Sequence, residues 1–216
     1  MSAVLFDMDG VVVDSESYWV RTERESILPE VVPDDDVAVE EITGRPYTEI
    51  YTYLDEHYEL AVSRERFLAL FEAAARDIYG EQVALLDGFE SLCSDIHEAG
   101  ASVALVTSSP YDWLDVVLDR FEIRGQFDAV VSASDVAAGK PAPDIYEQAA
   151  REVGEAPADC VAVEDSTHGA KSATAAGAFC IGYTGVHDSL DHDGVDVVAS
   201  TPEELHAAVF DFLGTR

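Results

Sequence analysis

The feature that most constrains the fold is a set of short apolar runs in which polar residues do not alternate with apolar ones. Five such runs are separated by stretches of helical character, at residues 3–6, 103–106, 129–131, 160–163 and 179–181. Strands of this kind are buried on both faces, which is typical of a parallel sheet with helices on each side. The pattern therefore predicts an α/β fold built on a doubly wound parallel sheet.

Several helix boundaries can be placed between these strands. Ser109 followed by Pro110 predicts a helix start with a capping hydroxyl, and the run 201–204 (Thr-Pro-Glu-Glu) predicts a capping box for the last helix. Gly100 and Gly177 lie where helices should end before the next strand. The boundaries agree with alternating strands and helices.

Residues 15–82 depart from this alternation, because they contain helical periodicity and no comparable apolar strand. Pro29, Pro33 and the Gly-Arg-Pro run at 44–46 divide the segment into several helices. A helical block between the first and second strands indicates an inserted domain. We therefore expect an α/β core domain of residues 1–14 and 83–216 and a helical cap domain of residues 15–82.

The charge of the chain excludes one class of partner and suggests a habitat. The 216 residues include 44 acidic side chains against 12 basic ones, for a formal net charge of −32. A protein that neutralises nucleic-acid phosphates needs the opposite sign, so nucleic acid is not expected as a partner. Concentrated salt shortens the Debye length and screens self-repulsion, so we expect a salt-loving cytoplasm.

Apolar runs and cysteines bear on the compartment. No apolar run approaches the roughly 20 residues of a membrane span, and Asp7 interrupts the N-terminal run too early for a secretion signal. The cysteines, Cys93, Cys160 and Cys180, share no metal-type spacing and are expected to be reduced packing residues. A cytoplasmic protein without a membrane partner is predicted.

Polar residues follow the ends of four predicted strands or lie in the loops beyond them. These residues are Asp7 and Asp9, Thr107, Lys140, and Glu164 and Asp165. Ligands of open α/β sheets bind beyond the carboxyl ends of the strands, so we expect the four segments to meet at one edge. Two carboxylates at the end of a buried strand are costly unless a cation or a proton offsets them.

The residue types predict the chemistry of that edge. Several carboxylates around one point suit Mg²⁺, which binds through a few carboxylates and a substrate phosphate oxygen. A lysine, a hydroxyl and a helix N-terminus suit a phosphate group. A carboxylate nucleophile can form an aspartyl-phosphate, and a second carboxylate can protonate the leaving oxygen and later deprotonate water. This combination predicts phosphoryl transfer.

The chain resembles the haloacid dehalogenase-like superfamily of phosphatases and phosphomutases over essentially its whole length. The resemblance rests on four motifs: Phe-Asp-Met-Asp-Gly at 6–10, Val-Thr-Ser-Ser at 106–109, Gly-Lys-Pro at 139–141, and Val-Glu-Asp-Ser at 163–166 leading to Gly169. It is similar to the subgroup with a helical cap, which includes β-phosphoglucomutase-like and phosphoglycolate-phosphatase-like proteins.

The resemblance implies a role for each matching residue. Asp7 would be the nucleophile and Asp9 the general acid and base. Thr107, Ser108 and Lys140 would bind the substrate phosphate. Mg²⁺ would be held by Asp7, the Asp9 carbonyl and Asp165, with Glu164 beside it.

Two features narrow the reaction within that resemblance. Dehalogenases of the superfamily lack the second aspartate of the first motif, so Asp9 favours phosphoryl chemistry. Phosphonate-cleaving members use a cap lysine, and residues 15–82 contain no lysine. The predicted enzyme is therefore a phosphatase acting on a small phosphorylated metabolite, a sugar phosphate or a phosphoglycolate-like compound.

Two other functions stay open at this point. A sugar phosphomutase would need cap cations, for which Arg45 is the best candidate, but Trp19 stands where the mutase pattern has a histidine. Trp19 could instead close over the substrate. A non-catalytic binding protein on the same fold is the other alternative, and the intact motifs argue against it. Among oligomeric states a monomer is slightly favoured.

Overall fold

The computed structural model describes residues 2–42, 47–186, 190–191 and 194–214. The chain forms two compact units, which we call the sheet unit (Met1–Asp14 and Ala84–Arg216) and the helical unit (Ser15–Val83). The chain thus leaves the sheet unit once, forms the helical unit, and returns.

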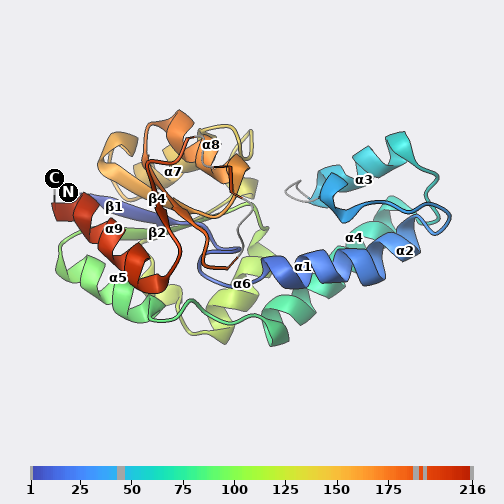
Figure 1. Ribbon diagram of the computed structural model, residues 1–216, viewed down its shortest axis with the longest axis horizontal. Helices are drawn as coiled ribbons and strands as arrows, with labels where there is room; N and C mark the ends of the chain where they lie inside the picture. The colour runs from blue at the N-terminus through green and yellow to red at the C-terminus, as the bar shows by residue number, and fades with distance from the viewer. Residues whose placement is uncertain (1, 43–46, 187–189, 192–193, 215–216) are drawn as a thin grey trace. The chain divides into compact units, whose positions relative to one another are not determined.

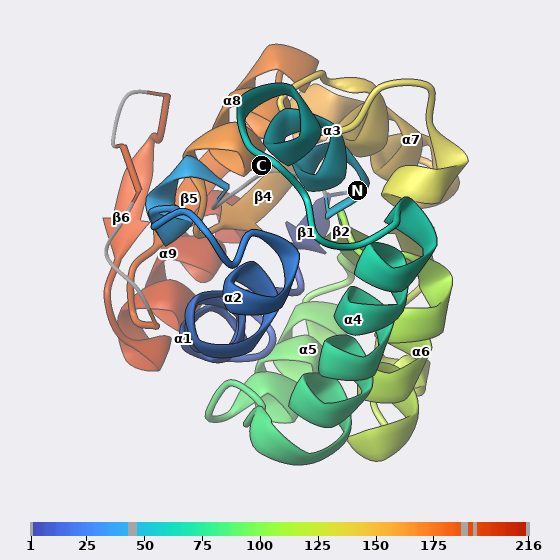
Figure 2. The same cartoon turned by 90° about the vertical axis from the view of Figure 1, so that its right-hand side faces the viewer.

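The sheet unit is built on six strands in the order β3-β2-β1-β4-β5-β6, and every neighbouring pair is parallel. Figure 2 shows β2, β1, β4, β5 and β6 side by side in this order. Their bounds are β1 Ala3–Phe6, β2 Ser102–Thr107, β3 Ala129–Ser132, β4 Cys160–Glu164, β5 Phe179–Tyr183 and β6 Val197–Ala199. The predicted α/β class with a parallel sheet is confirmed. All four residues of the central strand β1 are fully buried, as expected for a strand covered on both faces.

Helices cover both faces of this sheet. Their bounds are α5 Phe89–Glu98, α6 Tyr111–Arg120, α7 Asp144–Glu152, α8 Thr167–Ala176 and α9 Pro202–Gly214, with 3-10 turns at Arg124–Gln126, Ala133–Asp135 and Pro157–Asp159. The chain winds from β1 towards β3 and then reverses towards β6. Because strand crossovers are right-handed, this reversal places α7 and α8 on one face and α5 and α6 on the other, where α9 also lies (Figure 1).

The strand register brings the polar strand ends level with each other. Phe6 of β1 lies opposite Leu105 of β2 and Val163 of β4. The residues that follow on β1 and β4, Asp7 and Glu164, therefore emerge together at the carboxyl edge. This edge is the place where the reversal of strand order opens a crevice in doubly wound sheets.

The five predicted strands are present, each at the predicted place and up to two residues longer. Strand β6 was not predicted, because it has only three residues and two of them, Val197 and Val198, are exposed at the edge of the sheet. Gly177 caps α8 in the left-handed conformation, at φ +90°, and Gly100 follows α5 at φ +81°. At the start of α9, Thr201 Oγ1 accepts a hydrogen bond from the Glu204 amide, which is one half of the predicted capping box, and the Glu204 carboxylate accepts from the Ser200 amide.

The described part of the helical unit contains helical turns and no strand. The bounds are α1 Glu16–Thr22, a π-helical stretch Glu23–Ile27, α2 Leu28–Val31, a 3-10 turn Val39–Glu41, α3 Tyr47–His57, α4 Arg64–Asp77 and a second π-helical stretch Ile78–Gln82. Aromatic side chains form much of its core. The Trp19 ring stacks on Phe71, and its indole N–H donates to the Tyr79 hydroxyl at 3.1 Å.

The two places where the chain crosses between the units are tied together inside the sheet unit. The Ala84 amide donates to Asp14 Oδ1 at 2.6 Å, and the Asp14 amide donates to the Ala84 carbonyl at 3.2 Å. Val13 and Leu85 form an antiparallel bridge beside this pair. The outgoing and returning segments therefore run together like the two arms of a hairpin.

Two further expectations can be compared with the structure. Cys93, Cys160 and Cys180 are buried and form no disulfide, as expected for packing residues. Across the described ranges, every helix is too short or too polar to cross a lipid bilayer.

Candidate active site

Asp7 is the first residue after β1, and its carboxylate is held from two sides. Its backbone amide donates to the Val163 carbonyl at 3.0 Å, which fixes the residue against β4. Its Oδ1 accepts hydrogen bonds from the Met8 amide at 2.8 Å and from Lys140 Nζ at 2.9 Å. Only 7% of Asp7 is exposed. The carboxylate is therefore oriented by neighbours rather than by solvent.

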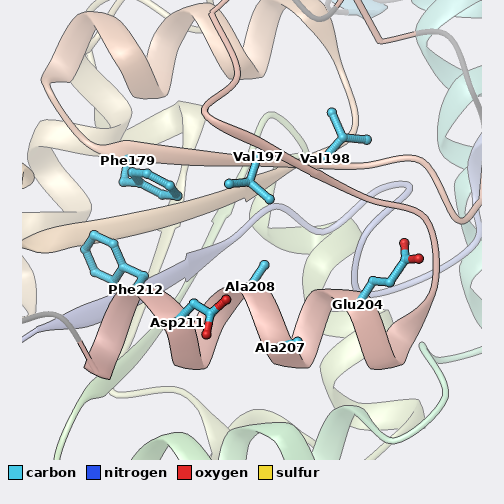
Figure 3. A pocket seen from close by; sticks show the side chains of 8 residues that line it. All are labelled: Phe179, Val197, Val198, Glu204, Ala207, Ala208, Asp211 and Phe212. Carbon is cyan, nitrogen blue, oxygen red and sulfur yellow. The ribbon is translucent and has the colours of Figure 1, made fainter.

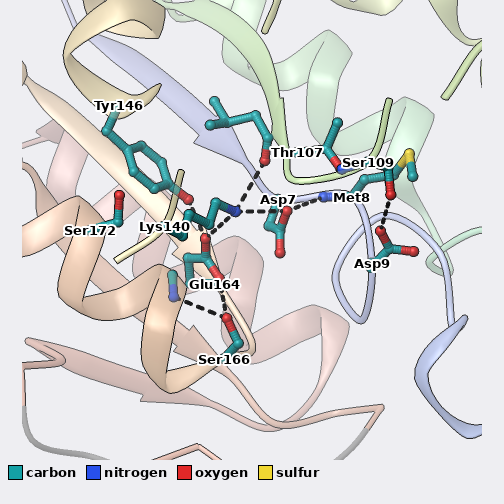
Figure 4. A network of polar contacts seen from close by, with 12 residues as sticks. Asp7, Met8, Asp9, Thr107, Ser109, Lys140, Tyr146, Glu164, Ser166 and Ser172 are labelled. Atoms are coloured by element: carbon teal, nitrogen blue, oxygen red, sulfur yellow. Dashed lines mark hydrogen bonds and ion pairs between the residues drawn. The ribbon is translucent and has the colours of Figure 1, made fainter. Parts of the chain in front are cut away.

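The Lys140 ammonium lies at the centre of the site (Figure 4). It contacts Asp7 Oδ1, Glu164 Oε1 at 2.6 Å and the Val106 carbonyl at 3.3 Å. An ammonium group has three N–H donors, so these three acceptors match its full capacity. Its charge is buried, because the side chain is only 5% exposed. A lysine in this position makes an ion pair with each of two buried carboxylates, and its single positive charge offsets one of their two negative charges.

Glu164 ends β4 and is fully buried. Its Oε1 accepts from Lys140 and from the Tyr146 hydroxyl, and its Oε2 accepts from Ser166 Oγ at 3.2 Å. Ser166 is also the N-cap of α8, since its Oγ accepts from the Gly169 amide at 3.0 Å. Both oxygens of Glu164 are thus engaged by the protein, and the residue holds the lysine in place.

Asp7, Glu164 and Asp165 form a buried acidic group. One carboxylate oxygen from each lies within 4.8 Å of the other two. Opposite ligands of Mg²⁺ are about 4 Å apart, so this spacing is close to that of oxygens around one such ion. Gly10 provides the space, because a Cβ at its position (φ +74°) would lie 1.8 Å from Asp165 Oδ2. The donor set, all carboxylate oxygens, fits a hard divalent cation.

Asp9 points to the other side of the loop that follows β1. Its Oδ2 accepts from Ser109 Oγ at 3.1 Å, and the Ser109 amide donates to Thr107 Oγ1 at 3.0 Å (Figure 4). Ser109 was predicted to cap α6, but the N-cap residue is Pro110 and makes no side-chain cap. The Ser109 hydroxyl donates to Asp9 instead, so that prediction was wrong. The Asp9 side chain is not part of the acidic group above.

Burial and charge shift the acid–base properties of the site. Burial raises the pKa of Asp7 well above its usual range, the nearby Glu164 raises it further, and Lys140 opposes both. Burial alone would lower the pKa of Lys140, but Asp7 and Glu164 together raise it above its ordinary value. The lysine therefore remains protonated. A second cation at the acidic group would stabilise Asp7 in its ionised form.

The other predicted site residues lie as follows. Thr107 is fully buried at the end of β2, and Ser108 is exposed just beyond it. Trp19 packs among aromatic side chains of the helical unit. Arg45 lies outside the described residues. The roles predicted for these residues remain predictions.

Sequence reasoning missed Tyr146 and the part played by Ser109 and Ser166. Tyr146 lies on α7, is fully buried, and its ring centroid lies 5.4 Å from Lys140 Nζ. Its position on the apolar face of an amphipathic helix resembles that of an ordinary core residue. The one available signal is its place six residues after Lys140, on the helix that the lysine loop leads into.

A separate groove lies beside β6 and α9 (Figure 3). It has a volume of about 520 Å³ and is lined mainly by apolar side chains of β5, β6 and α9, including Phe179, Val197 and Phe212. Its charged lining residues are both acidic, Glu204 and Asp211. None of the described residues that line the groove carries a positive charge.

Comparison with known proteins identifies the family of the chain. A family model described as haloacid dehalogenase-like hydrolase matches residues 1–177. The chain belongs to the haloacid dehalogenase-like hydrolases. Hexitol phosphatase B of Escherichia coli (strain K12) is 33% identical over 181 residues, covering 81% of this chain and 79% of the relative.

Two further relatives extend the comparison. The phosphorylated carbohydrates phosphatase of Thermotoga maritima is 29% identical over 82% of each chain. The crystal structure of CbbY from Rhodobacter sphaeroides in complex with phosphate has a TM-score of 0.78 and 26% identity, covering 93% of this chain and 94% of the other. The predicted membership of the family, and the prediction of a phosphomonoester hydrolase within it, are confirmed.

Proposed function

We propose that this haloacid dehalogenase-like hydrolase is a magnesium-dependent phosphatase of small phosphomonoesters that acts through an aspartyl-phosphate on Asp7. The supporting observation is the Lys140 ammonium, which is buried between Asp7 and Glu164, two members of the acidic group. A fixed cation next to a strand-end carboxylate is what an incoming phosphate dianion requires. The names of the relatives support a phosphorylated carbohydrate as substrate, and a phosphoglycolate-like acid is the other candidate.

In the first step Asp7 attacks phosphorus. One carboxylate oxygen of Asp7 forms a bond to phosphorus, and the ester oxygen of the substrate leaves with the bonding electrons. Asp9 donates a proton to that oxygen, so that the alcohol departs neutral. The hydrogen bonds to Asp7 Oδ1 hold the attacking carboxylate in one orientation.

In the second step water hydrolyses the aspartyl-phosphate. Asp9, now ionised, accepts a proton from the water as its oxygen attacks phosphorus. The bond between phosphorus and the Asp7 oxygen breaks, inorganic phosphate leaves, and the Asp7 carboxylate is restored. Ser109, which donates to Asp9 Oδ2, holds this side chain in place for both steps.

The remaining residues bind and neutralise the phosphoryl group. Thr107 and Ser108 would contact its oxygens, and Lys140 would exchange one of its three protein acceptors for a phosphate oxygen. Asp7, Asp165 and the Asp9 carbonyl would hold Mg²⁺, which supplies charge neutralisation when bound. Glu164 lies beside the metal and holds Lys140. The helical unit would act as the cap that selects the substrate, with Arg45 and Trp19 as its candidate contacts.

The role of Asp7 is tested by Asp7→Asn, with phosphate release from hexose and hexitol phosphates, phosphoglycolate and an aryl phosphate as the readout. Because the nucleophile is removed while the shape of the side chain is kept, we expect turnover to fall by at least about 10³-fold. The matched control is Asp35→Asn, the same change at an exposed loop aspartate, which should retain full activity. Substantial turnover by Asp7→Asn would contradict the proposal.

Removal of the metal tests the role of Mg²⁺. Dialysis against a chelator should abolish phosphate release, and addition of MgCl₂ should restore it, because the acidic group needs a cation to accept a phosphate dianion. Activity that survives chelation would contradict the metal requirement. Supplying a sugar phosphate with a bisphosphate activator distinguishes the alternatives, because a phosphomutase would form an isomerised sugar phosphate rather than release phosphate.

A further inference from the structure

Tyr146 is a buried polar residue of the sheet unit that the proposed mechanism does not use. It lies in the first turn of α7 and its side chain is fully buried. Its hydroxyl donates to Glu164 Oε1, the same oxygen that accepts from Lys140 (Figure 4). Its ring lies under the ammonium, with 5.4 Å between the ring centroid and Nζ. The residue therefore contacts both members of the Lys140–Glu164 pair.

The Lys140 ammonium is shared between two carboxylates that compete for it. Glu164 Oε1 lies 2.6 Å from Nζ, and Asp7 Oδ1 lies 2.9 Å from it. Glu164 is fully buried, so its negative charge acts on the ammonium with little screening by solvent. A hydrogen bond from a third group to Oε1 takes up part of the charge on that oxygen. Such a donor weakens the attraction of Glu164 for the ammonium, so the ammonium interacts more strongly with Asp7.

We infer that Tyr146 is a positioning residue, whose hydroxyl sets how the Lys140 ammonium is divided between Glu164 and Asp7 and thereby sets the affinity of the site for phosphate. The inference rests on the proposed function, in which Lys140 binds the phosphoryl group. Tyr146 itself touches Glu164 and Lys140, and it acts on the substrate only through them. The aromatic ring adds a favourable face for the ammonium, which Phe would retain.

The first experiment replaces Tyr146 by Phe and measures steady-state kinetics and inhibition by inorganic phosphate in the presence of Mg²⁺. Losing one hydrogen bond to a charged group should raise KM and the phosphate Ki by about 5- to 10-fold. The value of kcat should change by less than about twofold, because uniform binding is lost rather than transition-state binding. A fall in kcat with unchanged KM and Ki would overturn the inference.

The second experiment observes the lysine directly and does not require activity. The chain contains only two lysines, Lys140 and the exposed Lys171, so labelling with ¹⁵N- and ¹³C-lysine gives two side-chain signals. Lys171→Arg assigns them. Tyr146→Phe should move the Lys140 Nζ and Cε resonances and leave those of Lys171 unchanged. An unmoved Lys140 signal in the folded variant would overturn the inference.

A matched control and a second variant separate positioning from general packing. Tyr111→Phe removes another hydroxyl of the sheet unit that donates to a carboxylate, Asp135, and it should change neither the Lys140 signal nor the phosphate Ki. In a Glu164→Gln background the competing charge is gone, so adding Tyr146→Phe should change Ki by less than about twofold. If Tyr146→Phe still raised the phosphate Ki by about 5- to 10-fold in that background, the residue would act through packing alone.

These readouts keep the inference separate from the proposed function. If the wild-type protein releases no phosphate from any phosphomonoester, the proposed function fails. Calorimetric titration with inorganic phosphate and the Lys140 resonances would still show whether Tyr146 controls the ammonium.

Discussion

At the scale of single residues, Glu23 is an ionisable side chain that the fold buries. This residue of the helical unit is 8% exposed, and burial, together with the neighbouring Glu16, raises its pKa from 4.5 to about 8. A carboxyl group with a raised pKa binds its proton more tightly in the folded state than in the unfolded state. The stability it contributes is complete below about pH 4.5, declines as the pH rises, and is lost above about pH 8.

We therefore expect Glu23→Gln to stabilise the protein at alkaline pH. The amide cannot ionise, so the variant should match the wild type at pH 5 and exceed it at pH 9. The shift in pKa corresponds to a difference on the order of 5 kcal/mol in the free energy of unfolding. Denaturant unfolding at both pH values measures it. Glu25→Gln, an exposed change in the same π-helical stretch, serves as control, and equal pH profiles of the two variants would contradict the expectation.

The residues of the site differ in how far the sequence alone could predict them. Asp7 and Lys140 can be recognised in the sequence because packing alone does not account for them. Asp7 is a charged residue at the end of a buried strand, and Lys140 is a rare lysine in a Gly-Lys-Pro run. Packing does account for Tyr146, since a tyrosine on the buried face of a helix is typical of a core. Its role depends on a contact with Glu164, which lies 18 positions later in the sequence. The two residues are neighbours only because of the order of the strands in the sheet.

At the scale of elements, the packing of α8 against β4 depends on Gly169. A Cβ at this position would lie 1.9 Å from Glu164 Oε2, so the helix can approach the strand only if residue 169 has no side chain. Gly169→Ala must displace either α8 or the Glu164 carboxylate. Because the helix N-cap Ser166 also bonds to Glu164, displacement disturbs both the helix start and the lysine.

We expect Gly169→Ala to lower the free energy of unfolding by about 1–3 kcal/mol, as overpacking of a core does. Phosphate release should fall as well, because Glu164 holds Lys140. The matched change is Gly125→Ala, where a new Cβ meets nothing within 4 Å and the backbone is not left-handed. That control should keep its stability within about 1 kcal/mol of the wild type. Equal denaturation midpoints for the two variants would contradict this expectation, because they would show that α8 can accommodate the new methyl group with no loss of stability.

Elements buried on both faces could be predicted well, and marginal ones could not. β1 and β4 are short apolar runs with no competing interpretation, and their register follows from the parallel sheet. β6 has only three residues and pairs along one edge, so its sequence resembles a loop. At the start of α6, Ser109 and Pro110 match a cap pattern, but the hydroxyl reaches Asp9, a partner 100 positions away in the sequence.

At the scale of the whole molecule, a net charge of −32 on 216 residues opposes folding through self-repulsion. Salt shortens the Debye length from about 10 Å at 0.1 M to about 3 Å at 1 M, which screens most of this repulsion. We therefore expect the melting temperature at pH 7.5 to rise steadily between 0.1 and 2 M KCl. Calorimetry or circular dichroism measures the effect.

The protein provides its own control for that salt effect. Near its isoelectric point of about 4.1 the net charge is small, so the rise in melting temperature with KCl should be much smaller at pH 4.5 than at pH 7.5. If the melting temperature rose equally with KCl at both pH values, the cause would be general exclusion of salt from the protein surface rather than screening of charge. No dependence on salt at pH 7.5 would contradict the expectation of a salt-loving protein.

The paired crossing at Asp14 and Ala84 has a consequence for how such an enzyme can diversify. Because the outgoing and returning segments are hydrogen-bonded to each other within the sheet unit, the helical unit between them is an insertion with fixed end points. A homologous segment of different length could be grafted there without moving Asp7, the nucleophile that we propose, which lies seven residues upstream of Asp14. A new substrate specificity could then arise by exchange of one continuous segment of the gene, while the site residues of the sheet unit are inherited unchanged.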